Sequence, residues 1–169
     1  MDTKSAILKR RSIRKFKADK IDKNTVDELL EAAFAAPSAC NKHPLCFFVV
    51  TNEEKLSSLE GAGRFTSASS PLVIIVAADM KRTLPRSYSD YWIHDAAAAS
   101  QNILIRATDL GLGSLWCGVY LQKPLMQSIS RTLSLGDDIV PFSMIKLGYA
   151  DEELPPNCGI DIENVKFFD

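Results

Sequence analysis

Besides Lys42, four polar or nucleophilic side chains of different kinds lie within six residues, from Ser38 to His43. The surrounding stretch PSACNKHPL (residues 37–45) offers a hydroxyl, a thiol, an amide and an imidazole between a helix-like run and a strand-like run. A plain connecting turn needs only one or two chain-breaking residues. The stretch is therefore either a loop with ordinary turn chemistry or a segment that contacts a polar bound molecule.

A nucleophilic couple of Cys40 and His43 is one interpretation of this stretch. We do not favour it, because such a couple needs a spatial geometry that closeness in sequence does not supply. The chain has no CxxC pair and no zinc-ligand spacing among its four cysteines and two histidines, which are Cys40, Cys46, Cys117, Cys158, His43 and His94. We expect no metal site, free and mostly buried thiols, and a His43 that packs or hydrogen-bonds within the loop.

A second distinctive run, KRRSIRKFK (residues 9–17), holds six basic residues in nine. Arg10 and Arg14 flank Ser12, and two guanidinium groups with a hydroxyl between them suit a phosphate ester. A solvated basic surface and a weak nucleic-acid patch are the alternatives. The run is short, Phe16 is the only aromatic residue in it, and the net charge of the chain is -1, so nucleic acid is disfavoured.

Hydrophobic periodicity and chain breakers predict the elements that position these groups. Helices are predicted over about residues 4–10, 22–36, 51–60, 90–110 and 122–134, and strands over residues 46–50, 71–79, 114–120 and 139–150. Thr25 and Glu28 suggest a capping box for the second helix, with Asn24 or Asp22 as competing caps. Gly111 is expected to supply a left-handed cap for the long fourth helix, whose nearly all-round apolar surface predicts a place in the middle of the fold.

Length and composition favour one globular domain over residues 1–169, since 169 residues suffice for one core and the chain shows no linker or repeat. No apolar run reaches the ~20 residues needed to span a bilayer, so no membrane association is expected. The first residues lack the apolar core of a signal peptide, which favours the cytoplasm. A detached apolar piece, Val165 to Phe168, either pairs across a dimer interface or forms a local edge strand.

Four blocks of the sequence together resemble the nitroreductase family of FMN-dependent oxidoreductases. They are RRSIRKF, APSACNKHPLCFFVV, GLGSLWCG and IKLGYADEELPP, in the family's order and spacing over almost the whole chain. The resemblance implies an α+β fold with a central, mostly antiparallel sheet flanked by helices. It also implies a homodimer in which the C-terminal strand crosses to the partner's sheet.

The resemblance further implies that FMN lies at the dimer interface and contacts both subunits. One subunit holds the phosphate, ribityl chain and pyrimidine edge through Arg10, Arg11, Ser12 and Arg14. The other lines the flavin with Pro37, Ser38, Ala39 and Asn41. Trp116 forms a wall beside the ring, unless it is simply a core residue, and Gly118 allows close approach.

The implied activity needs no catalytic side chain, because the flavin carries the chemistry. NADH or NADPH reduces FMN, and a nitroaromatic, quinone or similar acceptor then takes the electrons. A non-catalytic flavin-binding protein, and a dehalogenase or ene-reductase on the same scaffold, are the alternatives. The chain departs from the family at Asn157–Gly159, where basic residues are expected. The phosphate would then depend on Arg10, with help from Ser12 and Arg11, unless Lys146 or Lys166 replaces them.

Overall fold

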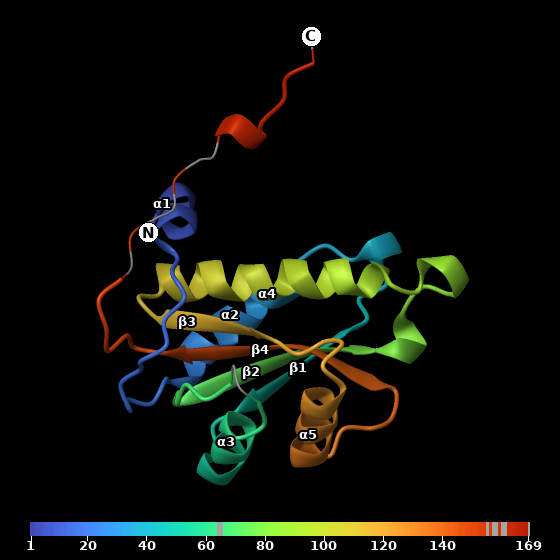
Figure 1. Ribbon diagram of the computed structural model, residues 1–169, viewed down its shortest axis with the longest axis horizontal. Helices are drawn as coiled ribbons and strands as arrows, with labels where there is room; N and C mark the ends of the chain where they lie inside the picture. Colours follow the sequence, from blue (N-terminus) through green and yellow to red (C-terminus); the bar gives the residue numbers. More distant parts are fainter. Residues whose placement is uncertain (64–65, 155, 157–158, 160–161, 169) are drawn as a thin grey trace.

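Four antiparallel strands form one sheet in the computed structural model, which describes residues 1–63, 66–154, 156, 159 and 162–168 (Figure 1). The strand order is β1-β2-β4-β3. The bounds are β1 Leu45–Val50, β2 Leu72–Asp79, β3 Gly113–Gly118 and β4 Ile139–Gly148. Helices cover both faces of this sheet, so the predicted α+β fold with an antiparallel sheet is confirmed.

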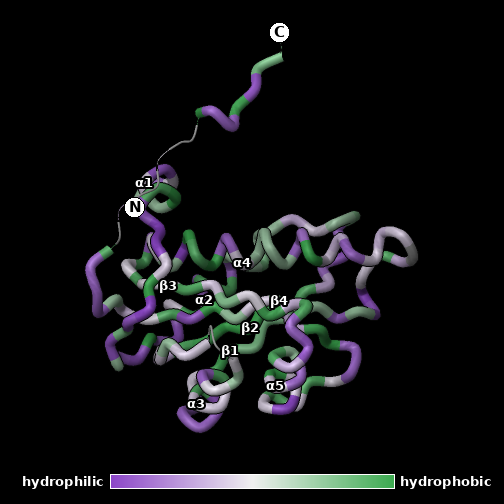
Figure 2. Tube along the Cα trace, in the orientation of Figure 1, coloured by the Kyte–Doolittle hydropathy of each residue, from purple (hydrophilic) through white to green (hydrophobic). Residues whose placement is uncertain are grey.

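Two hydrophobic cores lie on opposite faces of the sheet, because successive side chains of a strand point to opposite sides. Helices α2 (Lys23–Phe34) and α4 (Tyr91–Asp109) cover the face to which Ile74 and Val76 point. Helices α3 (Glu53–Glu60) and α5 (Lys123–Leu133) cover the face of Val73 and Ile75. The inner strand β2 is therefore apolar from Leu72 to Ala78, which Figure 2 shows in green.

All the predicted helices and strands are present, with small differences at their ends. Helix α2 begins at an Asp22 cap, whose carboxylate accepts hydrogen bonds from Thr25 N (3.0 Å) and Thr25 Oγ1 (2.7 Å). The Thr25–Glu28 capping box is therefore wrong, and Glu28 instead forms an ion pair with Arg106. Gly111 has a φ of +76°, which confirms the left-handed residue after α4.

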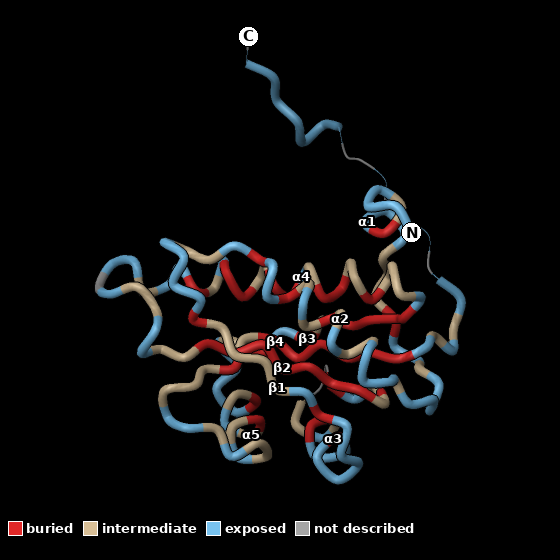
Figure 3. Tube along the Cα trace, turned by 180° about the vertical axis from the view of Figure 1, so that it is seen from behind, coloured by how far each residue is buried: buried red, intermediate tan, exposed pale blue. Residues whose placement is uncertain are grey.

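Helix α4 is buried on one side only, which corrects the expectation that it lies in the middle of the fold. Its sheet-facing residues, such as Ala96 and Ile103, are fully buried. A stripe along the other side contains half-exposed Ala98 and Ile105 and exposed Gln101. Figure 3 shows this change of burial across the helix. Within this chain α4 is thus an outer layer with one uncovered face.

The C-terminal segment extends away from the sheet, beyond helix α1 (Thr3–Lys9) (Figure 1). Its residues 165–168 form no strand, and Phe167 and Phe168 are 81% and 95% exposed. The prediction that residues 165–168 form a local edge strand is therefore wrong. Pairing of this segment across a dimer interface stays a prediction. Asn157 and Cys158 lie outside the described residues. No helix in the described part of the chain is long and apolar enough to cross a membrane.

Candidate functional site

The basic segment, defined here as residues 10–14, is held against the edge strand β3 by backbone pairing. Ser12 forms a parallel bridge with Ser114, and Ile13 N donates to Ser114 O at 2.9 Å. Ile13 is 1% exposed and packs over Gly113, where a Cβ atom would lie 3.0 Å from two Ile13 side-chain carbons. A buried isoleucine and a glycine thus position the arginines at the sheet edge.

A carboxylate from the distant segment after β4 fixes the end of the basic segment. Glu152 Oε1 accepts from Arg14 N at 2.5 Å and from Lys15 N at 3.2 Å. These backbone hydrogen bonds, chiefly that from Arg14, hold the pKa of Glu152 below its usual range. Burial raises the pKa of the Cys117 thiol on β3, while the charges of Lys146 and Arg14 act in the opposite direction.

The three arginines of the basic segment differ in their contacts. Arg11 Nη1 donates to Leu8 O (2.8 Å) and to Arg10 O (2.7 Å), and so closes the C-terminus of α1. The guanidinium groups of Arg10 and Arg14 form no ion pair with any residue that the structure describes. Arg10 and Arg14 are therefore better placed than Arg11 to bind an external anion.

Strand β3 adds a buried, unpaired hydroxyl beside the basic segment and, four residues further along the strand, an open surface at Gly118. Ser114 is 1% exposed, and its Oγ has no hydrogen-bond partner among the described residues. Gly118 is exposed, and a Cβ atom there would meet nothing within 4 Å. Trp116 is half-buried, with its ring centroid 6.0 Å from that of Phe142. The structure thus brings residues 10–14 together with β3, and Trp116 serves partly as core.

The polar loop, defined here as residues 37–43, is tied together by its own side chains. Ser38 Oγ accepts from His43 N at 3.0 Å, and His43 Nε2 lies 2.7 Å from Asn41 Oδ1. The prediction that His43 hydrogen-bonds within the loop is confirmed. Cys40, Asn41 and His43 have φ values of 49°, 56° and 46°, a left-handed conformation that is uncommon for residues other than glycine, although Asn and His adopt it more often than most.

The basic segment and the polar loop lie near opposite ends of α4. Ala39 N donates to Asp95 Oδ1 (2.9 Å) in the first part of the helix. The basic segment pairs instead with Ser114, which follows soon after α4 ends at Asp109. At about 1.5 Å per residue, Asp95 and Asp109 are about 21 Å apart along the axis. One chain alone therefore does not bring the two predicted halves of the site together.

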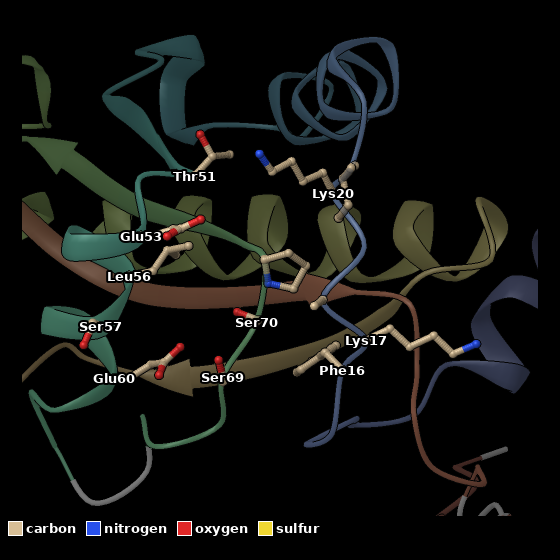
Figure 4. Close-up of a pocket in the computed structure, with 13 residues that line it drawn as sticks. Phe16, Lys17, Lys20, Thr51, Glu53, Leu56, Ser57, Glu60, Ser69 and Ser70 are labelled. Atoms are coloured by element: carbon tan, nitrogen blue, oxygen red, sulfur yellow. The ribbon is translucent and has the colours of Figure 1, made fainter.

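A separate hollow of about 490 Å³ lies between Phe16, α3 and Ser70 (Figure 4). Glu53 and Glu60 line it from α3, and Lys17 and Lys20 line it from the segment after Phe16, so its lining carries charges of both signs and no net positive charge. Pro37–Asn41 and the arginines of the basic segment do not line it. This hollow is therefore not the anion site that the sequence predicts.

Two other expectations need correction. Lys146 is 0% exposed and donates to Ala68 O at 2.5 Å, and burial lowers its pKa, so it cannot serve as an accessible phosphate ligand. Lys166 lies exposed in the C-terminal segment. Cys117 is buried, but Cys46 is only half-buried and Cys40 is exposed, so only one of the three cysteines that the structure describes is buried. No group of His, Cys, Asp and Glu in the described ranges could hold a metal ion.

Sequence reasoning missed Asp95, Gly113 and Ser114 as residues that build the site. Asp95 offered a signal, because it is an acidic residue within the apolar run of a helix. Gly113 and Ser114 lie in the GLGS run, but their roles depend on contacts with residues about a hundred positions earlier in the chain. Such contacts leave no periodic pattern.

Comparison with known proteins agrees with this architecture. The family model described as "Nitroreductase family" matches residues 7–66 and 62–149. A Methanothermobacter thermautotrophicus protein, provisionally named NADH dehydrogenase/NAD(P)H nitroreductase, is 37% identical over 154 residues, which are 90% of this chain and 79% of that protein. A crystal structure of a Parabacteroides distasonis protein with the same provisional name has a TM-score of 0.91 at 30% identity, covering 98% and 96% of the two chains. An FMN-dependent nitroreductase from Clostridium difficile has a TM-score of 0.86 at 32% identity, covering 98% of each chain.

Proposed function

Because the chain belongs to the nitroreductase family, we propose that it is an FMN-dependent oxidoreductase that takes electrons from NADH or NADPH. The final acceptor is a nitroaromatic, a quinone or a similar small oxidised molecule. One observation carries the proposal: the sheet edge at Ser114 presents Arg10, Ser12 and Arg14 next to an unpaired hydroxyl. The similar Clostridium difficile protein, itself an FMN-dependent nitroreductase, supports the choice of cofactor.

The residues at this edge suit FMN in charge and in shape. Arg10 and Ser12 would bind the phosphate, because guanidinium groups and hydroxyls donate to phosphate oxygens. Arg14 would place positive charge beside the pyrimidine edge of the ring. Gly118 leaves open space for a flat ring system, next to the half-buried Trp116. When bound, FMN supplies the hydride and electron transfer, and these residues orient it.

The arrangement of the two half-sites supports a homodimer, each chain being a single domain over residues 1–169. Two α4 helices packed antiparallel by their uncovered faces would bring the polar loop of one chain to the basic segment of the other. The partner loop would then line the ring with Pro37, Ser38, Ala39 and Asn41. Exposed Ile7 (49%) and Leu8 (50%) on α1 add apolar surface of the kind that interfaces cover.

The C-terminal segment fits the same assembly. Phe167 and Phe168 are almost fully exposed in the single chain, although large apolar side chains are usually covered. We infer that this segment crosses to the partner's sheet. Truncation after Glu153, which keeps Glu152, should therefore raise the dimer dissociation constant in sedimentation equilibrium, and an unchanged constant would contradict the crossing.

A spectrum and a titration test the proposed function. We expect the purified protein to be yellow, to bind one FMN per chain without a covalent bond, and to bleach on addition of NADH or NADPH under anaerobic conditions. Adding menadione or nitrofurazone should restore the colour. A colourless chain that gains no flavin absorbance with added FMN would contradict the proposal. Flavin that binds but is reduced by neither nicotinamide would point instead to a non-catalytic flavin-binding protein.

A further inference from the structure

The polar loop is held to the rest of its chain by a buried carboxylate on α4. Asp95 is 6% exposed, and its Oδ1 accepts the backbone N–H of Ala39 at 2.9 Å. The two residues are 56 positions apart in sequence, so this contact is tertiary and is not a helix cap. The other side-chain hydrogen bonds of the loop join its own residues Ser38, Asn41 and His43.

A carboxylate in this position is costly to bury. Its neighbours on the sheet-facing side of α4 include fully buried Ala96 and Ala99 and the 2%-exposed Trp92. A polar group among apolar side chains is tolerated when it is hydrogen-bonded, as Asp95 Oδ1 is by Ala39 N. The hydrogen bond between Ala39 N and Asp95 Oδ1 therefore satisfies the buried carboxyl group and also fixes the position of the loop.

The loop needs an anchor because its backbone is strained. Cys40, Asn41 and His43 all have positive φ values, and none of them is glycine. L-residues leave this conformation readily unless surrounding contacts fix it. The anchor at Ala39 lies directly before the three strained residues and on the segment proposed to line the partner's flavin.

We propose that Asp95 is a positioning residue of the flavin site: its buried carboxylate holds the strained loop of one subunit in the shape that receives the flavin of the partner. This inference rests on the proposed function. Asp95 touches no part of the flavin and acts through Ala39, so flavin affinity depends on a residue of the helix core.

Three variants of α4 test the inference. Asp95→Ala removes the acceptor, and Asp95→Asn keeps an oxygen acceptor without the charge. Ser100→Ala is the matched control, because Ser100 is also buried on α4 but hydrogen-bonds Ser143 Oγ at 2.8 Å in the sheet instead of a residue of the loop. FMN affinity by fluorescence titration, thermal stability, and amide exchange of residues 39–42 in the flavin-free protein are the readouts.

We expect Asp95→Ala to weaken FMN binding at least fivefold and to speed amide exchange at Ala39–Lys42. Asp95→Asn should lose only about twofold, because a neutral hydrogen bond is weaker than a charge-assisted one. Ser100→Ala should lower thermal stability but keep FMN affinity within twofold. A purely structural role of Asp95 would make Asp95→Ala behave like Ser100→Ala, and that result would overturn the inference.

Two further outcomes are decisive. Should Asp95→Ala fail to fold, Asp95→Ser keeps a polar group at the site but is too short to reach Ala39 N, and the same fivefold loss is expected of it; an affinity within twofold of wild type would overturn the inference. If wild-type protein binds no FMN, the proposed function fails. The exchange rates of the flavin-free Asp95→Ala protein would then still test the anchor, and unchanged rates at Ala39–Lys42 would overturn it.

Discussion

The basic segment and the polar loop lie near opposite ends of α4 and are held in different ways. The basic segment is pinned by backbone pairing to β3, by buried Ile13 and by the Glu152 carboxylate. The polar loop is held by local side-chain bonds and by one carboxylate, Asp95, and its backbone is strained. The first half-site is cationic and rigidly attached to the sheet, whereas the second is uncharged apart from Lys42 and His43 when protonated.

This difference matches the two ends of the proposed ligand. A phosphate needs charge-assisted donors at fixed positions, which a strand edge supplies. A planar ring needs close backbone approach and adaptable polar groups, which a loop of small residues supplies. The comparison predicts that substitutions in the basic segment mainly weaken binding of the FMN phosphate. Substitutions in the polar loop should mainly weaken binding of the flavin ring.

The largest effect is expected from Gly113→Val, which breaks the attachment of the basic segment. A Cβ atom there would lie 3.0 Å from Ile13, so the segment must move away from β3. Overpacking of this kind costs roughly 1–3 kcal/mol, and FMN affinity should fall with it. Urea unfolding and FMN titration measure both. Gly136→Ala is the control, because a Cβ atom at Gly136 meets nothing within 4 Å; equal losses in the two variants would contradict the role of Gly113.

Arg10→Ala tests the charge of the basic segment without moving its backbone. We expect at least a tenfold loss of FMN affinity, about 1.4 kcal/mol. Riboflavin, which lacks the phosphate, should be much less affected. Titration of wild type and variant with both flavins measures this selectivity. Equal losses for FMN and riboflavin would mean that Arg10 has a structural role instead.

Asn41→Leu tests the polar loop, and we expect a smaller loss. One neutral hydrogen bond contributes about 1 kcal/mol, so FMN affinity should fall about fivefold, with riboflavin affected equally. Asn41 is exposed, so the variant should stay folded, with thermal stability lowered slightly by the lost hydrogen bond with His43 and by the left-handed φ. Unchanged flavin affinity together with unchanged NAD(P)H oxidation would mean that the loop is an ordinary connecting turn that does not contact the flavin.

Glu152→Gln should have the smallest effect and should show in the pH dependence. Backbone hydrogen bonds, first that from Arg14, lower the folded pKa of Glu152 below the reference value of 4.5. The stabilisation that the Glu152 carboxylate gives the folded chain is therefore fully present above the pKa that Glu152 has in the unfolded chain. It is lost as pH falls through the lower pKa that Glu152 has in the folded chain. Wild-type protein should release riboflavin more readily in this acid range, and the variant should lose that dependence while binding about twofold more weakly at pH 7. Identical acid profiles would contradict the role of Glu152.

The sequence predicted the elements well because their signals are local. The spacing of Leu29 and Ala33, the apolar run of β2 and the glycine after α4 each describe one element by itself. The candidate site residues were predicted through resemblance to a family. The residues that hold them in place, such as Asp95 and Gly113, were not predicted. Asp95 and Lys146 are buried charges whose partners, Ala39 N and Ala68 O, come from distant segments. The apolar run around Asp95 was a local signal of its burial, but the identity of its partner depends on the assembled fold.

Mixed dimers test most directly the central claim that each flavin site is built from two chains. Arg10→Ala and Asn41→Leu chains, each with its own affinity tag, can be co-expressed and purified through both tags. One site of the mixed dimer then carries both substitutions, and the other carries neither. We predict that the mixed dimer binds one FMN with wild-type affinity. The Arg10→Ala homodimer and the Asn41→Leu homodimer should have no site of wild-type affinity. If both halves came from the same chain, every site would carry one substitution, and a mixed dimer without any wild-type site would contradict the account.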